Sequence, residues 1–110
     1  MGISKTEKFS VKQNSIANLI KAVGHPARVA IIEYLIKRKT CVCGDIVNEL
    51  SLAQPTISQH LKELKNVGLI QGTIDGTSVC YCLNDEVILK LANYFNSLSV
   101  KLTHQKITCC

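Results

Sequence analysis

Residues 54–73, QPTISQHLKELKNVGLIQGT, form the stretch of sequence that decides the fold. Proline suits the first turn of a helix and glycine suits its end, so Pro55 and Gly68 predict the two boundaries of one helix. Between them, apolar residues recur at intervals of three and four, which is the spacing of a buried stripe. These apolar residues are Ile57, Leu61 and Leu64. The stretch therefore predicts an amphipathic helix with one face turned to a core.

The segments on either side of this helix complete a recognisable motif. Before it, the short turn 51–53 follows an expected helix from about Gly44 to Ser51. After it, two β-prone runs, 69–74 and 78–83, are joined by Asp75-Gly76-Thr77, and Asp-Gly between such runs is a strong hairpin signal. Two helices joined by a tight turn and followed by a two-stranded wing describe a winged helix-turn-helix.

Three more helices are predicted outside this motif. The first starts near Val11, the second has Pro26 in its first turn, and Asn84 and Asp85 cap the last. The expected apolar stripes are Ile16, Leu19, Ile20 and Val23 in the first helix; Val29, Ile32, Leu35 and Ile36 in the second; and Val87, Ile88, Leu91, Phe95, Leu98 and Leu102 in the last. The predicted fold class is mainly α with a small β-hairpin. Residues 1–110 are expected to form a single domain, with 1–10 as a flexible arm and 104–110 as a flexible tail.

Composition narrows the class of protein. The chain has 110 residues, of which 46% are hydrophobic, and a formal net charge of +5 at pH 7. A chain this short is only marginally stable alone, and many such chains gain burial by dimerising. A basic balance is compatible with a polyanionic partner. The sequence has no run of about 20 apolar residues and no apolar leader, so we expect a cytoplasmic protein without membrane contact.

The polar face of the 54–68 helix is the predicted DNA-reading surface. Gln59 can read adenine with two hydrogen bonds, and Ser58 can reach either base type. Lysines and the helix N-terminus suit phosphate. An ordinary solvent-exposed helix face is the alternative. The adjoining turn and hairpin favour the DNA-reading interpretation over it. The expected DNA-binding residues are Gln54, Pro55, Thr56, Ser58, Gln59, Lys62 and Lys65, with Gly76 and Thr77 on the wing; His60, near the buried boundary, is expected to be packed.

Six cysteines fall in three close pairs, at 41 and 43, 80 and 82, and 109 and 110. In a reducing cytosol, paired thiols more often indicate metal binding or redox sensing than disulfides. Cys41 and Cys43, two residues apart in an extended segment, would point the same way and could share one soft ion. The neighbouring helix N-terminus favours their thiolates. Two small cysteines packed in a core are the alternative.

Four blocks of the chain together resemble the ArsR/SmtB family of metalloregulatory repressors, with the arsenic-responsive type most similar. They are LIKAVGHPAR (19–28), CVCGDI (41–46), QPTISQHLK (54–62) and GTSVCYCLN (76–84). The resemblance implies a homodimer that binds an inverted repeat in double-stranded operator DNA and is released by an inducer. It also implies that the last helix pairs with the first across the dimer axis. The expected inducer is As(III) or Sb(III), or another soft ion such as Cd(II), Pb(II) or Zn(II), and no organic cofactor is expected.

The thiol site departs from the family pattern. The third cysteine of a local metal box would stand at position 46, where this chain has Ile46, and no cysteine precedes Cys41. Trigonal As(III) needs three sulfurs, so Cys109 or Cys110 is expected to complete the site. Unused thiols at a frayed end are the alternative for this pair. Cys80 and Cys82 on the wing are weaker candidates.

Three other functions are alternatives to metal release. A thiol redox or persulfide sensor on the same scaffold could bridge Cys43 and Cys109 on oxidation. An enzyme is not expected, because no thioredoxin-like pattern, nucleophile triad or phosphate loop accompanies the cysteines. A protein-interaction domain without DNA affinity is a further, weaker alternative, and a salt-sensitive shift with duplex DNA would exclude it.

Overall fold

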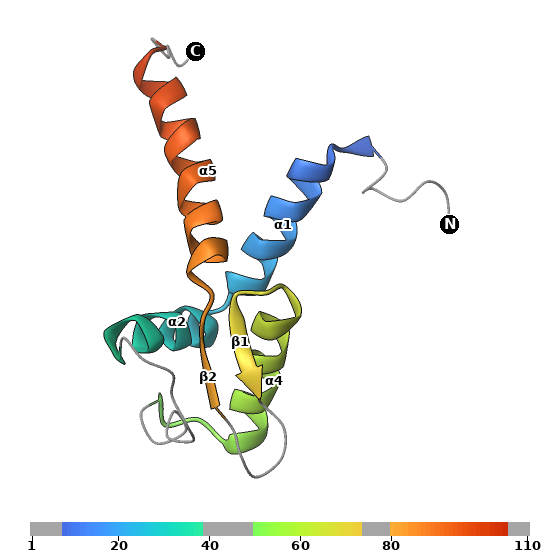
Figure 1. Ribbon diagram of the computed structural model, residues 1–110, viewed down its shortest axis with the longest axis vertical. Coiled ribbons are helices and arrows are strands. Elements are labelled where there is room, and N and C mark those ends of the chain that lie inside the picture. Colours follow the sequence, from blue (N-terminus) through green and yellow to red (C-terminus); the bar gives the residue numbers. More distant parts are fainter. Residues whose placement is uncertain (1–7, 39–49, 74–79, 106–110) are drawn as a thin grey trace.

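The computed structural model describes residues 8–38, 50–73 and 80–105. Its elements in chain order are α1 (Val11–Val23), α2 (Pro26–Arg38), α4 (Gln54–Asn66), β1 (Ile70–Thr73), β2 (Cys80–Leu83) and α5 (Asp85–Thr103). Figure 1 shows α2, α4 and the hairpin gathered at one end, while α1 and α5 extend from it as two arms. The predicted fold class, mainly helical with a small hairpin, is confirmed. The expected helix from about Gly44 to Ser51 lies almost wholly outside the described residues.

No helix within the described ranges combines the length and the apolar character needed to cross a membrane.

Local hydrogen bonds set the helix ends. The Ser10 hydroxyl accepts from the Gln13 backbone N–H at 3.0 Å, and the Gln13 side chain accepts from the Ser10 N–H at 3.0 Å, which forms a capping box on α1. At the end of α4, the N–H groups of Gly68 and Leu69 donate to the carbonyls of Lys65 and Leu64 at 2.9 and 3.0 Å. With Gly68 at φ +81°, this is a Schellman motif, so the glycine ends the helix as predicted.

The core lies where α4, α2, α1 and the wing meet. The residues of α4 that were predicted to face inward are fully buried. They pack with Ile31 of α2, Leu19 of α1 and Tyr81 of β2, all of which belong to one apolar cluster. The three buried apolar residues of α4 are Ile57, Leu61 and Leu64. Packing on one side of α4 thereby leaves its other side at the surface.

The wing is a two-stranded antiparallel sheet in which Ile70 pairs with Leu83 and Gly72 pairs with Tyr81. Gly72 has φ +125°, and a Cβ at this position would overlap the carbonyl oxygen of Cys80. Only glycine therefore permits this close approach of the two strands. On β2, Tyr81 is buried, whereas Cys80 and Cys82 are half-buried.

The buried stripe predicted for α2 is partly wrong. Val29 and Ile36 were expected inside but are 42% and 55% exposed, whereas Ile31 is fully buried beside Leu35. In α1, likewise, Ile20 is exposed and Ala22 is buried. Apolar residues surround much of α2, so spacing alone does not select the face that meets the core.

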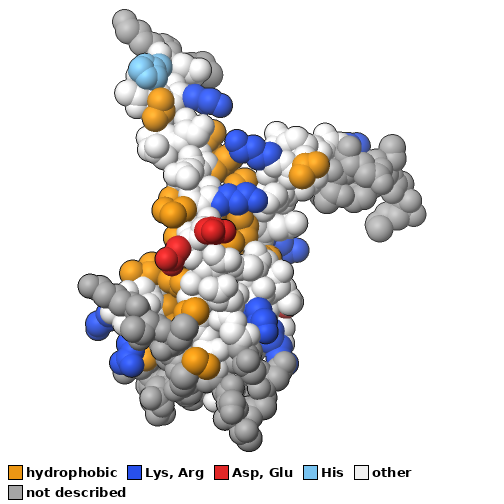
Figure 2. All heavy atoms as spheres, in the orientation of Figure 1, with side chains coloured by type: hydrophobic (Ala, Val, Ile, Leu, Met, Phe, Trp, Pro, Cys, Tyr) orange, Lys and Arg blue, Asp and Glu red, His pale blue; other side chains and the backbone are white. Residues whose placement is uncertain are grey.

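Helix α5 shows the apolar spacing that was predicted, but none of its residues is buried. Val87, Ile88 and Leu91, near its start, pack against the core. Farther along, Phe95, Leu98 and Leu102 are 51%, 37% and 55% exposed. Figure 2 shows apolar side chains at the surface along this arm. The second half of α5 thus presents an apolar stripe that the described residues leave exposed.

Candidate nucleic-acid interface

The outward side of α4 carries every DNA-contact residue that the sequence predicted for this helix. Ser58 is half-buried, and the others are exposed. The exposed ones are Gln54, Pro55, Thr56, Gln59, Lys62 and Lys65. The helix therefore presents amides, hydroxyls and two cations on the side away from the core. Such groups can hydrogen-bond to base edges and contact phosphates.

Two side-chain hydrogen bonds organise this surface. The Gln54 amide donates to the Ser58 hydroxyl at 3.3 Å, and the Gln59 amide donates to the Glu63 carboxylate at 3.1 Å. Glu63 was absent from the predicted set, although its position four residues after Gln59 is a spacing at which helix side chains meet. Because a carboxylate repels phosphate but can accept from the cytosine amino group, Glu63 adds a discriminating group beside Gln59.

The N-terminus of α4 has no side-chain cap from its N-cap residue. Its N-cap residue is Ala53, which has no side chain able to cap, and Pro55 stands in the first turn. The first main-chain bond of the helix joins the Ile57 N–H to the Ala53 carbonyl at 3.0 Å. The first turn contains no acidic residue. An uncapped helix N-terminus without carboxylates is suited to a phosphate group.

His60 is packed, as predicted, on the inner border of α4. It is 8% exposed, and its Nδ1 accepts a hydrogen bond of 3.0 Å from Nε of Arg28 on α2. Burial lowers the pKa of His60 below its ordinary value of 6.5, and the neighbouring His25 and Arg28 lower it further. His60 therefore packs on the inner border of α4, where it joins this helix to α2.

The predicted thiol ligands and wing-tip residues, Cys41, Cys43, Cys109, Cys110, Gly76 and Thr77, lie outside the described residues. Within the part of the chain that the structure describes, no three His, Cys, Asp or Glu side chains gather closely enough to hold a metal ion. The thiol site therefore stays a prediction from the sequence.

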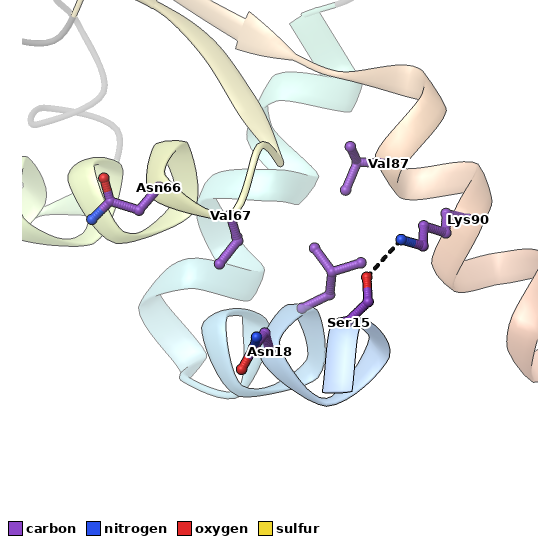
Figure 3. A pocket seen from close by; sticks show the side chains of 7 residues that line it. Ser15, Asn18, Asn66, Val67, Val87 and Lys90 are labelled. Atoms are coloured by element: carbon purple, nitrogen blue, oxygen red, sulfur yellow. Dashed lines mark hydrogen bonds between the residues drawn. The ribbon is translucent and has the colours of Figure 1, made fainter. Parts of the chain in front are cut away.

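A hollow of about 260 Å³ lies where α1, the end of α4 and α5 meet. Figure 3 shows Val67 and Val87 pointing into it from two sides, with the Lys90 ammonium donating to the Ser15 hydroxyl at 2.7 Å. Asn66, the last residue of α4, also lines it. The hollow thus lies between the end of α4 and the two arms, α1 and α5.

The arrangement of a polar outward helix, a tight core and a short wing is matched by known proteins. Residues 25–71 match the family model described as "Bacterial regulatory protein, arsR family". The protein described as "Uncharacterized HTH-type transcriptional regulator MJ1325" of Methanocaldococcus jannaschii is 38% identical over 74% of this chain and 96% of its own length. The chain belongs to the ArsR family.

Two further comparisons bear on this ArsR-family chain. A homologue of the cadmium resistance transcriptional regulatory protein CadC in Staphylococcus aureus is 34% identical over 81% of this chain and 75% of its own length. The crystal structure of the ArsR family transcriptional regulator RHA00566 superposes with a TM-score of 0.73 at 14% identity, covering 86% of this chain and 96% of that chain. This likeness confirms the winged-helix fold.

Membership of the ArsR family also assigns the general activity. Other matching proteins are described as transcriptional repressors. The chain is thus a transcriptional repressor of a DNA-binding family, and, as expected from its sequence, its relatives are regulators and not enzymes.

Proposed function

We propose that this repressor binds operator DNA through the outward face of α4 and is released when a thiophilic inducer binds its cysteines. The observation that carries the DNA-binding part is the row of mostly polar, mostly exposed residues from Gln54 to Lys65 on one side of α4, opposite the side that buries Ile57, Leu61 and Leu64. A helix of this kind fits the major groove, where short polar side chains meet base edges.

Each residue of this surface has a distinct part in the proposed complex. Ser58 and Gln59 contact base edges, and Glu63 limits which bases are accepted next to Gln59. Lys62 and Lys65 neutralise phosphates, which adds affinity that depends on salt concentration. Gln54, Pro55 and Thr56 bring the open N-terminus of α4 to a phosphate. On the wing, Gly76 and Thr77 would make a second contact beyond the reading helix.

The repressor acts as a homodimer in this proposal. The exposed apolar half of α5 supports a homodimer, because the side chains of Phe95, Leu98 and Leu102 are 51%, 37% and 55% exposed in a single chain. Pairing through the α5 and α1 arms would place two copies of α4 at a spacing of about 34–36 Å, which matches successive major grooves. Because its partner is DNA, we place the dimer in the cytoplasm.

The inducer in this proposal is As(III) or Sb(III), held by Cys41 and Cys43 with Cys109 or Cys110 as the third sulfur. Thiolates are the ligands that such soft ions accept, and the CadC homologue supports Cd(II) as another member of the same class. Binding would shift the segment before α4 and so move the reading helix. Coupling of about 1–3 kcal/mol would lower operator affinity about 5–150-fold.

A titration of the reduced full-length chain tests this proposal. The probe is a labelled duplex that the chain itself selects from a random pool, and fluorescence anisotropy reports binding while As(III), Cd(II), Zn(II) or polysulfide is added. We expect As(III) to release the duplex. Cys41→Ser should bind the duplex as the parent does but lose the response, and Cys80→Ser is the matched control that should keep it.

The outcomes separate the alternatives. Release of Cys41→Ser by As(III) would remove this cysteine pair as the sensor. Release by Cd(II) alone would favour a divalent soft ion. Release by polysulfide together with a mass change for a Cys43–Cys109 bridge would favour the redox repressor. A chain that selects no duplex at all would contradict DNA binding through α4.

A further inference from the structure

Three residues from two parts of the sequence form a small polar cluster behind the reading helix. Arg28, in the first turn of α2, donates from Nε to Nδ1 of His60 on α4 at 3.0 Å. The same guanidinium donates from Nη1 to the carbonyl of Ala22, near the end of α1, at 3.0 Å. His25, between α1 and α2, places its ring 4.5 Å from the His60 ring, centroid to centroid. One side chain, Arg28, therefore joins three helices.

The chemistry of this contact fixes the protonation state of His60. A guanidinium only donates hydrogen bonds, so Nδ1 of His60 must carry a lone pair, and the single ring proton must sit on Nε2. An imidazolium would present an N–H to another N–H, and the contact would be lost. The hydrogen bond between α2 and α4 therefore exists only while His60 is neutral.

The surroundings of His60 also disfavour a proton. The side chain is 8% exposed, and among the described residues the charged or titratable neighbours that act on it are His25 and Arg28 from the α1–α2 side. Both are basic. On α4 itself, the nearest carboxylate in sequence is Glu63, which accepts from Gln59 instead. Burial and these two neighbours together lower the pKa of His60, so the neutral form prevails at neutral pH.

We propose that His60 is a positioning residue whose hydrogen bond from Arg28 docks the reading helix on α1 and α2, and that its protonation on mild acidification undocks this helix and weakens operator binding. The inference rests on the proposed role of α4 in DNA binding. His60 directly follows Gln59 in α4. Loss of the Arg28–His60 hydrogen bond on the inner side of the helix would therefore also move Gln59 on its outer side. An error of about 1 Å at such a site is enough to spoil its hydrogen bonds.

The link to Ala22 extends the consequence to the arms. Because Arg28 holds the end of α1 and α4 at the same time, loosening one of its bonds changes how the reading helix sits relative to α1. In the proposed dimer, α1 belongs to the pairing region. Protonation of one buried ring would thereby alter the spacing of the two reading helices without touching the cysteines.

Two measurements on the full-length chain test the proposal. The first is histidine ¹⁵N–¹H NMR without DNA, from about pH 8 to pH 5, the range in which histidines titrate. We expect His60 as the Nε2–H tautomer, with a midpoint below 6.5 and backbone amide signals of α4 shifting at the same midpoint. The other tautomer, a midpoint above that value, or α4 signals that do not follow His60 would overturn it.

The second measurement is anisotropy with the selected duplex over the same pH range at constant ionic strength. The parent should lose affinity on acidification about fivefold or more, the lower end of typical coupling between sites. In His60→Asn the amide oxygen can accept from Arg28 and does not titrate, so binding should stay near the parental level at neutral pH and become flat with pH. His104→Asn, which changes an exposed histidine at the end of α5, should keep the parental profile.

Parallel pH profiles for the parent and His60→Asn would overturn the proposal. If His60→Asn does not fold, Arg28→Met serves instead, because it removes the donor and the cation. Its His60 midpoint should rise and its affinity at neutral pH should fall. A chain that binds no duplex at any pH would contradict the proposed function, whereas the NMR titration would still decide whether protonation of His60 moves α4.

Discussion

The ammonium of Lys90 on α5 donates a hydrogen bond of 2.7 Å to the hydroxyl of Ser15 on α1, although 75 positions of sequence separate them. This bond ties the base of one arm to the other, beside the hollow drawn in Figure 3. Beyond it, the second half of α5 leaves the rest of the molecule, as Figure 1 shows. The contact thus links the bases of the two arms, and the exposed apolar residues Phe95, Leu98 and Leu102 lie farther along α5.

Charge placed on this stripe should separate the proposed dimer. Phe95 is 51% exposed in one chain, so burying the exposed half of its side chain would contribute about half of the roughly 1.5–3 kcal/mol that full burial gives. We expect Phe95→Asp to be folded but monomeric by light scattering on a sizing column, and to bind the selected duplex more weakly. Asn96→Asp, one position away and also exposed, is the control with the same added charge. A dimeric Phe95→Asp would show that pairing uses another surface.

Two substitutions on α4 should separate affinity from sequence reading. Lys62→Ala removes a phosphate partner, so it should weaken all duplexes alike and reduce the slope of log affinity against log salt by about 0.9. Gln59→Ala removes a base-reading group, so it should cost about 1–3 kcal/mol on the selected duplex and little on others. Competition assays at several salt concentrations distinguish them. Equal losses on all duplexes for both variants would contradict the assigned roles.

The wing should not tolerate a side chain at Gly72. An added Cβ would overlap the Cys80 carbonyl oxygen, and φ +125° is a conformation that other residues rarely adopt. We expect Gly72→Ala to lower the free energy of unfolding by about 1–3 kcal/mol in urea titrations. Gly24→Ala is the matched control, because Gly24 has φ −73° and the nearest atom to a Cβ there is at 3.3 Å. A loss at Gly24 as large as at Gly72 would refute the steric explanation.

The stability of the chain should depend on pH through His60. Its pKa in the folded chain lies below the ordinary 6.5, so below that pH the unfolded chain binds more protons than the folded one. The free energy of unfolding is then highest above about pH 6.5 and falls as the pH drops toward the folded pKa. Urea titrations near pH 7.5 and 5.5 measure the change. His60→Asn should show a smaller loss, and an equal loss in both proteins would assign the dependence to other groups.

Sequence signals predicted α4 well because they act over a few residues. Pro55 at its start and Gly68 in its Schellman end are local preferences of the backbone, and the inner side of the helix needs only the spacing of Ile57, Leu61 and Leu64. The hairpin followed in the same way from Asp-Gly between two β-prone runs. The predicted buried stripe of α2 was partly wrong because that helix is apolar over much of its circumference, so the choice of face belongs to its neighbours.

By itself, then, the sequence determined the order of elements, the bounds of the reading helix and the polar residues on its outer side, since hydrogen-bonded turns and helix periodicity are properties of short segments. Only the tertiary structure decided that Arg28 meets His60 across 32 positions and that the second half of α5 stays uncovered. Burial depends on which distant elements pack together, and no spacing within one helix contains that information.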